Sequence, residues 1–167
     1  MMRVSHPVLM ALCAAGLMAG PAVSQRPDNQ LNPLSVTFLS QGQQQLSVGK
    51  FDEASDSLES ALAADPRNRA AFVSLARVAQ KQRLFGKSIR LTNKALALEP
   101  NDLDALEVQG EAMVELGAKA RAQANLAKLQ KLCPSGCKQV ATLSGAITRG
   151  PTVASARASK TPTPKTN

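Results

Sequence analysis

The stretch ALAADPRN occupies residues 61–68, and ALALEPND follows 34 residues later at residues 95–102. After 34 more residues the chain reads LQKLCPSG, at residues 129–136. Each stretch ends an apolar run with a proline, at Pro66, Pro100 or Pro134. Proline cannot continue a helix interior but is tolerated in a first turn, so it marks the junction between helical units. We therefore expect three units, at residues 35–68, 69–102 and 103–136.

Within each unit, two sets of residues recur at a spacing of i, i+4 and i+7, which places each set on one face of a helix. Glycines lie where the first helix of two units must end, as a left-handed helix cap requires. Each unit is thus predicted to be a hairpin of two helices of about 14 residues, one with bulky and one with small facing side chains, so that the axes approach to roughly 8–10 Å. The first set is Phe38, Gly42 and Gln45, then Phe72, Ala76 and Ala79, then Leu106, Gly110 and Met113. The second set is Ala54, Leu58 and Ala61, then Ser88, Thr92 and Ala95, then Ala122, Leu126 and Leu129, and the glycines are Gly49 and Gly117.

The composition agrees with closely packed helices. The chain of 167 residues is 44% hydrophobic but only 2% aromatic, whereas strands favour aromatic and β-branched residues. One helical hairpin cannot bury both of its faces, and about three stacked hairpins are needed for stability. The predicted fold class is therefore an all-α solenoid of three helix-turn-helix units. Val140, Leu143 and Ile147 lie on one face of a further helix, at residues 137–149, which we expect to cap the last hairpin.

These residues resemble the tetratricopeptide repeat (TPR) family, most closely at GKFDEASDSLESALAADP, residues 49–66. The resemblance covers about 100 residues in three units in register. Arg83 replaces the turn glycine of the second unit, which costs about 1 kcal/mol if that residue must be left-handed. Gln41 and Gln109 stand where the family usually has an apolar residue. In the third unit Lys119 replaces the turn aromatic and Leu129 replaces an alanine.

The resemblance implies a concave groove, lined by the first helix of each unit, that holds a peptide or a partner helix. Arg77 and Lys81, one helical turn apart, can grip a partner's carboxylates, or they can pair with Glu107 and Glu111 on the next helix and stabilise only the stack. The basic–Asn clamp by which some cytosolic TPR domains hold chaperone tails is not reproduced in the first unit. The groove residues are Leu39, Gln43, Leu46 and Ser47, then Val73, Arg77, Gln80 and Lys81, then Glu107, Glu111, Val114 and Glu115.

The N-terminus has the pattern of an export signal. A basic start is followed by an apolar run at residues 8–19 and by small residues at Ala22 and Ser24. That run of about 12 residues is shorter than the roughly 20 that span a bilayer, and the bulky Leu12 argues against a lipoprotein signal ending at Cys13. We expect residues 1–24 to be removed after Ser24, residues 25–34 to be a short linker, and the mature protein to be periplasmic. Residues 150–167 are basic, rich in proline and predicted to be disordered.

Cys133 and Cys137 are the two cysteines of the predicted mature chain, because Cys13 lies in the export signal. Pro134 and Gly136 favour a tight reversal that can bring the two thiols together. A zinc site needs about four ligands, a redox dithiol usually has two intervening residues, and a nucleophilic thiol needs a base such as histidine. A structural disulfide therefore fits an oxidising compartment best, and it stabilises by roughly 2 kcal/mol in the chain-entropy model.

The remaining features bear on function. There is no phosphate-binding loop, no Ser/His/Asp set and no histidine after the signal, so an enzyme is not expected, nor a cofactor or metal. The first unit has two basic against five acidic residues and the second has seven against two, so head-to-tail self-association is conceivable.

We expect a non-catalytic scaffold of the bacterial envelope that binds a protein or peptide, in pilus, secretion or outer-membrane assembly. The alternative is a binder of nucleic acid or another anionic polymer, which would use the basic tail and the basic second unit, including Lys87, Arg90 and Lys94. The chain lacks the aromatic residues on which bases stack. We therefore do not expect nucleic acid as the partner.

Overall fold

The computed structural model describes residues 30–152 and folds them into helices, without a strand in that range. The predicted export signal and most of the basic tail lie outside the described residues. None of the helices described here has the length and apolar character to cross a membrane. In chain order the helices are α1 (Pro33–Ser47), α2 (Phe51–Ala64), α3 (Arg69–Lys81), α4 (Phe85–Leu98), α5 (Leu103–Glu115), α6 (Lys119–Leu132) and α7 (Lys138–Arg149).

The first helix of each hairpin begins at a side chain that caps it. Asn32 accepts a hydrogen bond from the Leu34 amide at 3.0 Å, Asn68 accepts one from Ala71 and Asp102 accepts one from Ala105. Such caps satisfy amides that have no partner inside the helix. The buried Asn68 also donates to the Ser35 hydroxyl at 2.8 Å, and this bond joins the first hairpin to the second.

The turn inside each hairpin is the same in all three units. At the end of α1, the Lys50 amide bonds to the Gln45 carbonyl and the Gly49 amide bonds to Leu46, and equivalent pairs end α3 and α5. This Schellman arrangement requires a left-handed residue. That residue is Gly49 (φ +78°), Gly117 (φ +75°) and, in the second hairpin, Arg83 (φ +60°). The expectation that Arg83 occupies a position that favours glycine is therefore confirmed.

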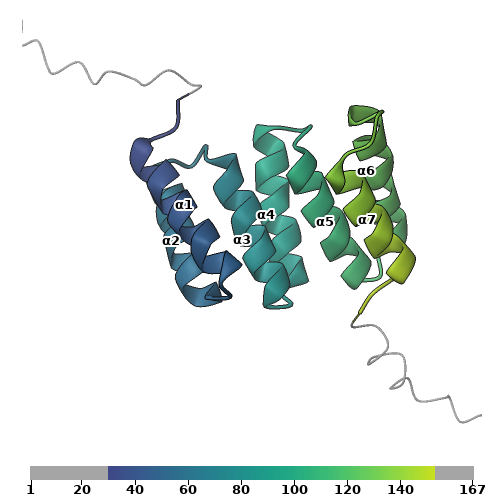
Figure 1. Ribbon diagram of the computed structural model, residues 1–167, viewed down its shortest axis with the longest axis horizontal. Helices are drawn as coiled ribbons and strands as arrows, with labels where there is room; N and C mark the ends of the chain where they lie inside the picture. The colour runs from purple at the N-terminus through teal and green to yellow at the C-terminus, as the bar shows by residue number, and fades with distance from the viewer. Residues whose placement is uncertain (1–29, 153–167) are drawn as a thin grey trace, which may run out of the picture. The chain divides into compact units, whose positions relative to one another are not determined.

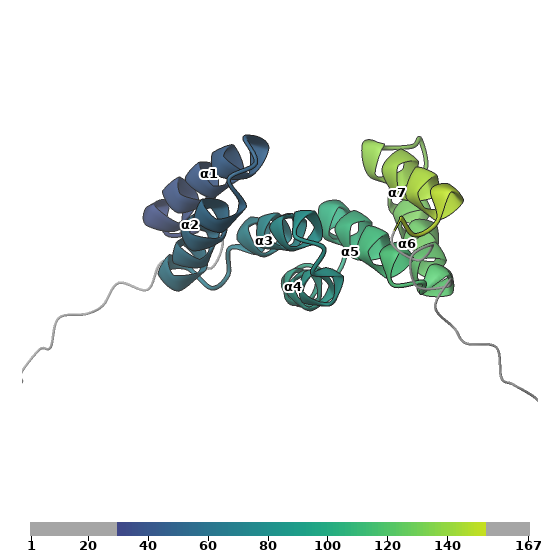
Figure 2. The same cartoon turned by 90° about the horizontal axis from the view of Figure 1, so that it is seen from below.

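The three hairpins stack in chain order, and each contacts the next (Figure 1). In the view of Figure 2, α1 and α7 rise at the two ends of a concave face whose floor is α3 and α5, while α4 lies on the outer side. Small residues allow the close approach within a hairpin: a Cβ atom built on Gly42 of α1 would lie 2.5 Å from Cγ of Leu58 in α2. The expected all-α solenoid with a capping helix is confirmed.

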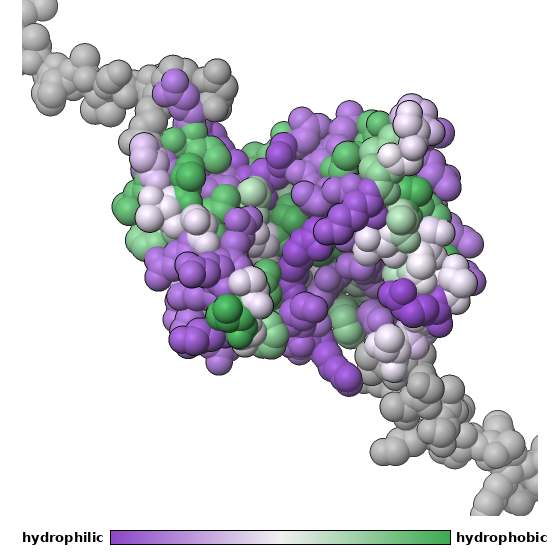
Figure 3. Space-filling view, in the orientation of Figure 1, coloured by the Kyte–Doolittle hydropathy of each residue, from purple (hydrophilic) through white to green (hydrophobic). Residues whose placement is uncertain are grey.

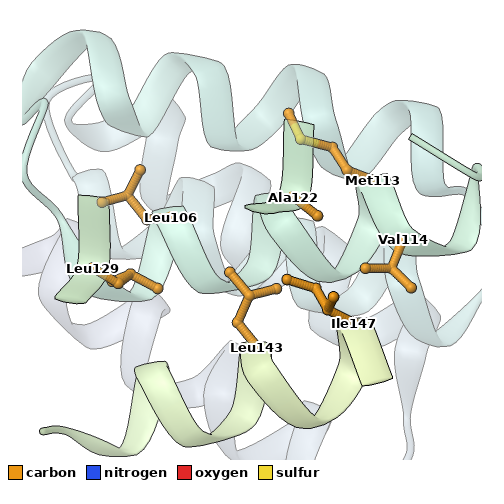
Figure 4. Close-up of a cluster of buried hydrophobic side chains, with 7 residues drawn as sticks. All are labelled: Leu106, Met113, Val114, Ala122, Leu129, Leu143 and Ile147. Atoms are coloured by element: carbon orange, nitrogen blue, oxygen red, sulfur yellow. The ribbon is translucent and has the colours of Figure 1, made fainter. Parts of the chain in front are cut away.

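The capping helix packs into the third hairpin through Leu143 and Ile147, as Figure 4 shows. Leu143 fills the space left by Gly110, where a built Cβ atom would lie 2.6 Å from both Leu143 methyl carbons. α7 therefore contacts α5 as well as α6. Their shared core contains Leu106, Met113, Val114, Ala122, Leu129, Leu143 and Ile147.

Candidate functional site

The concave face contains a hollow of about 620 Å³ between the first helices of the hairpins and α7. In Figure 3, which looks onto this face, hydrophilic side chains cross the middle, and hydrophobic ones lie on both sides of them, over α1 and over the last helices. The hollow is lined by Leu46, Ser47, Gly49, Phe51, Arg77, Gln80, Lys81, Glu107, Glu111, Lys138 and Thr142. Its wall therefore changes from apolar at the first hairpin to charged at the second and third.

Arg77 is the basic residue at the centre of the hollow, and it is held by two carboxylates of α5. Its guanidinium lies 3.4 Å from Asp104 and 3.5 Å from Glu107. Glu107 is only 3% exposed, and burial raises the pKa of its carboxyl while the Arg77 charge opposes that rise. The expected pairing of Arg77 with Glu107 is thus present. It leaves Arg77 less free to bind a ligand than its position alone suggests.

Lys81 and Glu111 face the same hollow with fewer contacts. Burial raises the pKa of Glu111, and this rise is opposed by the charge of Arg77, by a hydrogen bond from Gln80 and by the charges of Arg149 and Lys81. Lys81 is exposed and forms no ion pair within residues 30–152. Its ammonium group is therefore available to a ligand.

The other predicted groove residues are distributed around this centre. Glu115 lines an adjoining hollow of about 230 Å³ that it shares with Arg149. Gln43 lines a smaller one and donates a hydrogen bond to the Ser74 hydroxyl at 3.2 Å. Leu39 is half-buried against the core of the first hairpin.

Two of the residues predicted to line the groove are almost fully buried. Val73 is 6% exposed and packs with Ala105 and Val108, because α5 covers it. Val114 is 3% exposed and packs with Leu143, because α7 covers it. Val73 still lines the small hollow beside Gln43, whereas Val114 is covered by α7 and offers little surface to a ligand.

Conversely, α7 contributes Lys138, Thr142 and Arg149 to the hollows, and the sequence analysis did not place them there. The 34-residue repeat could have predicted their position. One further 34-residue step carries α5 (103–115) onto residues 137–149, and Glu115 onto Arg149. α7 thus takes the place of the first helix of a fourth unit, with side chains toward the groove.

The two cysteines lie at the junction of α6 and α7, with the left-handed Gly136 (φ +82°) between them. Both thiols are free, and a hydrogen bond between them raises the pKa of Cys133 and lowers that of Cys137. The side chains are therefore neighbours, and the disulfide stays a prediction. Within the described residues no three His, Cys, Asp or Glu side chains are grouped as a metal ion requires.

Comparison with known proteins bears on the fold. No family model matches the sequence, and a search of curated proteins finds no match. Among solved structures, the first TPR of Spaghetti (RPAP3), bound to the HSP90 peptide SRMEEVD, is similar with 22% identity and a TM-score of 0.63, over 70% of this chain and 95% of that one.

Two further TPR domains are similar to the chain. The Sgt2 TPR domain from Aspergillus fumigatus has 16% identity and a TM-score of 0.66, over 82% of this chain and 91% of that one. The TPR2B domain of yeast Sti1, in complex with pHsp70, has 15% identity and a TM-score of 0.63, over 69% of this chain and 96% of that one. The fold of this chain is therefore an α-solenoid of TPR hairpins.

Proposed function

We propose that this chain is a non-catalytic TPR scaffold that binds an extended peptide or a partner helix in its concave groove. The observation that carries the proposal is the hollow of about 620 Å³, whose wall combines half-buried Leu46 with the exposed cations Lys81 and Lys138. A few polar groups around an apolar floor are typical of a recognition site. One of the similar TPR domains is bound to an HSP90 peptide and another is in complex with pHsp70, which is consistent with a peptide or protein as ligand.

The groove suggests the chemistry of the ligand. Leu46 and Phe51 favour an apolar side chain at the α1 end, and Lys81 with Lys138 favours an acidic group toward the centre. The first hairpin places Leu39, Gln43 and Leu46 on this face, without a basic residue, and Arg77 is already held by α5. A chaperone tail held by basic residues of the first hairpin is therefore not the partner we propose.

The compartment is part of the proposal. The pattern of residues 1–24 supports export, and the bacterial envelope is then where the scaffold would meet its partner, in pilus, secretion or outer-membrane assembly. Mass spectrometry of the protein purified from its host tests this directly. A mature chain that begins at Gln25 would support export, and one that retains residues 1–24 would contradict it.

The binding proposal is tested with a peptide that has been selected, from a displayed random library, for binding to the mature chain. Fluorescence anisotropy then compares wild type with Lys81→Glu/Lys138→Glu, two exposed groove residues on different helices. The matched control is Arg90→Glu/Lys94→Glu, on the outer helix α4. We expect at least about tenfold weaker binding for the groove variant, because charge-assisted bonds are replaced by repulsion, and little change for the control. Unchanged binding by the groove variant together with loss by the control would place the site on the outer face.

The alternative, a binder of anionic polymers through the outer face of α4, has less support. Lys87 lies 3.9 Å from Glu59, and the Lys94 ammonium lies over the Phe72 ring, 5.6 Å from its centroid. Two of the three cations in that stripe are thus already engaged within the fold.

A further inference from the structure

The turns inside the three hairpins form one edge of the solenoid, and each turn exposes an aliphatic side chain. Val48 is 66% exposed, Leu84 is 48% exposed and Leu116 is 55% exposed. Because each hairpin reverses direction at its turn, all three turns lie on the same side, the lower side of Figure 1, where α7 also ends. We call this side the turn edge, defined by residues 48–50, 83–84 and 116–119.

Each aliphatic residue of the turn edge has a basic neighbour in the same turn. These are Lys50, Arg83 and Lys119, all exposed. Within residues 30–152, Arg83 and Lys119 form no ion pair, and Lys50 has only a long contact of 3.9 Å with Glu53. Counting the adjoining helical turns and the Glu59 partner of Lys87, seven cations stand against the four acids Asp52, Glu53, Glu59 and Glu115, so the edge is basic. The seven are Lys50, Lys81, Arg83, Lys87, Lys119, Arg121 and Arg149.

The opposite edge, where consecutive hairpins join, differs in charge. There Arg69 pairs with Asp102, and Lys128 donates to the Pro100 carbonyl at 2.6 Å. Arg67 is bound to Asp65. Three cations of that edge are thus used within the fold, whereas Lys131 and Lys138 are exposed there without an ion pair among residues 30–152. Leu98 and Leu132 are exposed there as well.

The helix N-termini differ between the two edges in the same sense. On the opposite edge α1, α3 and α5 begin with the capping side chains Asn32, Asn68 and Asp102, and only α7 begins there without a side-chain cap. On the turn edge α2, α4 and α6 have no side-chain cap, and α4 and α6 have no acidic residue in the first turn. Uncapped amides at a helix N-terminus favour phosphate groups, so this feature adds to the basic residues beside it.

The basic tail starts from the same edge. Thr152 donates two hydrogen bonds to the Glu115 carboxylate, from its amide at 3.0 Å and from its hydroxyl at 2.8 Å. The sequence that follows contains Arg157, Lys160 and Lys165 and no acidic residue. The chain therefore leaves the described residues at the turn edge, and the three positive charges belong to the segment that follows.

We propose that the turn edge docks on the surface of an anionic phospholipid bilayer. Val48, Leu84 and Leu116 enter the boundary between headgroups and acyl chains, while Arg83 and Lys119 contact lipid phosphates. Exposed aliphatic and basic groups together provide the two signals that stable peripheral attachment needs. The helices then stand on the membrane and the groove opens sideways, so a groove ligand and the bilayer bind at the same time. This proposal does not depend on which peptide the groove takes.

The absence of tryptophan from the chain allows a direct test of insertion. Leu116→Trp places a fluorophore on the turn edge, and Leu98→Trp places one at a similarly exposed position on the opposite edge (55% and 46% exposed). The mature chain of each variant is mixed with vesicles of phosphatidylcholine, with or without about one third phosphatidylglycerol. We expect a blue shift, and quenching by brominated acyl chains, only for Leu116→Trp and only with phosphatidylglycerol. Equal signals from both positions, or none from Leu116→Trp, would overturn the proposal.

Vesicle co-sedimentation of charge variants tests the electrostatic part. We compare the turn-edge variant Arg83→Asn/Lys119→Gln with Arg90→Gln/Lys94→Gln on the outer face. Asparagine replaces Arg83 because it tolerates the left-handed turn. A basic residue at an anionic surface contributes about fivefold in partitioning, so the turn-edge variant should bind roughly 25-fold more weakly. The same loss in the control would show a nonspecific charge effect and overturn the assignment to this edge. Circular dichroism checks that each variant remains helical.

Discussion

At the scale of single residues, Arg83 shows where local conformation and residue type disagree. It takes the left-handed conformation (φ +60°) that Gly49 and Gly117 take in the other two turns. A side chain with a Cβ atom is strained there, by roughly 1–2 kcal/mol. Arg83 is also exposed, so its replacement removes no core contact.

We therefore expect Arg83→Gly to raise the free energy of unfolding by about 1 kcal/mol, after allowance for the added entropy of the unfolded chain. Urea unfolding followed by circular dichroism measures the change. Gly117→Ala, the reverse change at the equivalent turn, should destabilise the protein, since open space around its Cβ position does not relieve the strain of φ +75°. A less stable Arg83→Gly would mean that the arginine side chain makes a contribution larger than this strain.

Asp65 is a second residue with a measurable role. The Arg67 guanidinium beside it, with amide hydrogen bonds from Asn32 and Arg67, lowers the pKa of its carboxyl to about 2 against the opposing effect of burial. The unfolded chain then binds more protons than the folded one between pH 4 and pH 2. Stability from Asp65 is therefore fully present above about pH 4 and is lost as the pH falls toward 2.

Asp65→Asn should lower the free energy of unfolding by about 2 kcal/mol at neutral pH, and the difference from wild type should shrink toward pH 2. Measuring this difference cancels the contributions of Glu107 and Glu111, whose raised pKa values act in the opposite direction. A difference that does not vary with pH would show that the carboxylate charge has no part in the effect.

At the scale of elements, the sequence predicts the helices well, because their signals are local. The proline interval, the face periodicity and the turn residues mark both ends of each hairpin, and Asn32 begins α1 as its Asn–Pro pair indicates. The groove is predicted less well because it depends on neighbouring helices. Val73 and Val114 occupy positions expected to face the groove, but α5 and α7 cover them. The path of α7 across α5 depends on Leu143 filling the space that Gly110 leaves open, a fit between two helices that no periodicity encodes.

The junction of α6 and α7 yields the prediction at this scale. The thiols of Cys133 and Cys137 are neighbours across a short turn, so oxidation needs little movement of the chain. We expect that the mature protein, isolated without reductant, has no free thiol. Reduction should lower its free energy of unfolding by about 2 kcal/mol. Quantitative thiol labelling counts the free thiols, and urea unfolding measures the change in the free energy of unfolding. The control is Cys133→Ser/Cys137→Ser, whose stability should not respond to reductant. Two labelled thiols in freshly isolated, unreduced protein would contradict the predicted disulfide.

At the scale of the whole molecule, the hairpins depend on one another. The second hairpin buries its first helix against both neighbours: Val73 packs with residues of α5, and Leu75 and Val78 pack with Ala54 and Leu58 of α2. Both proposed surfaces follow from this stack. The groove exists because first helices lie side by side, and the turn edge exists because all three turns point the same way.

The most direct test of this interdependence is removal of one complete repeat, residues 69–102, which joins Asn68 to Leu103 and leaves Asn68 where Asp102 capped α5. If the hairpins shelter one another, the shortened chain remains helical but unfolds at a lower urea concentration. Its unfolding should also depend less steeply on urea, by roughly a quarter, because less surface is buried. An unchanged midpoint and slope would contradict the stack on which both surfaces depend.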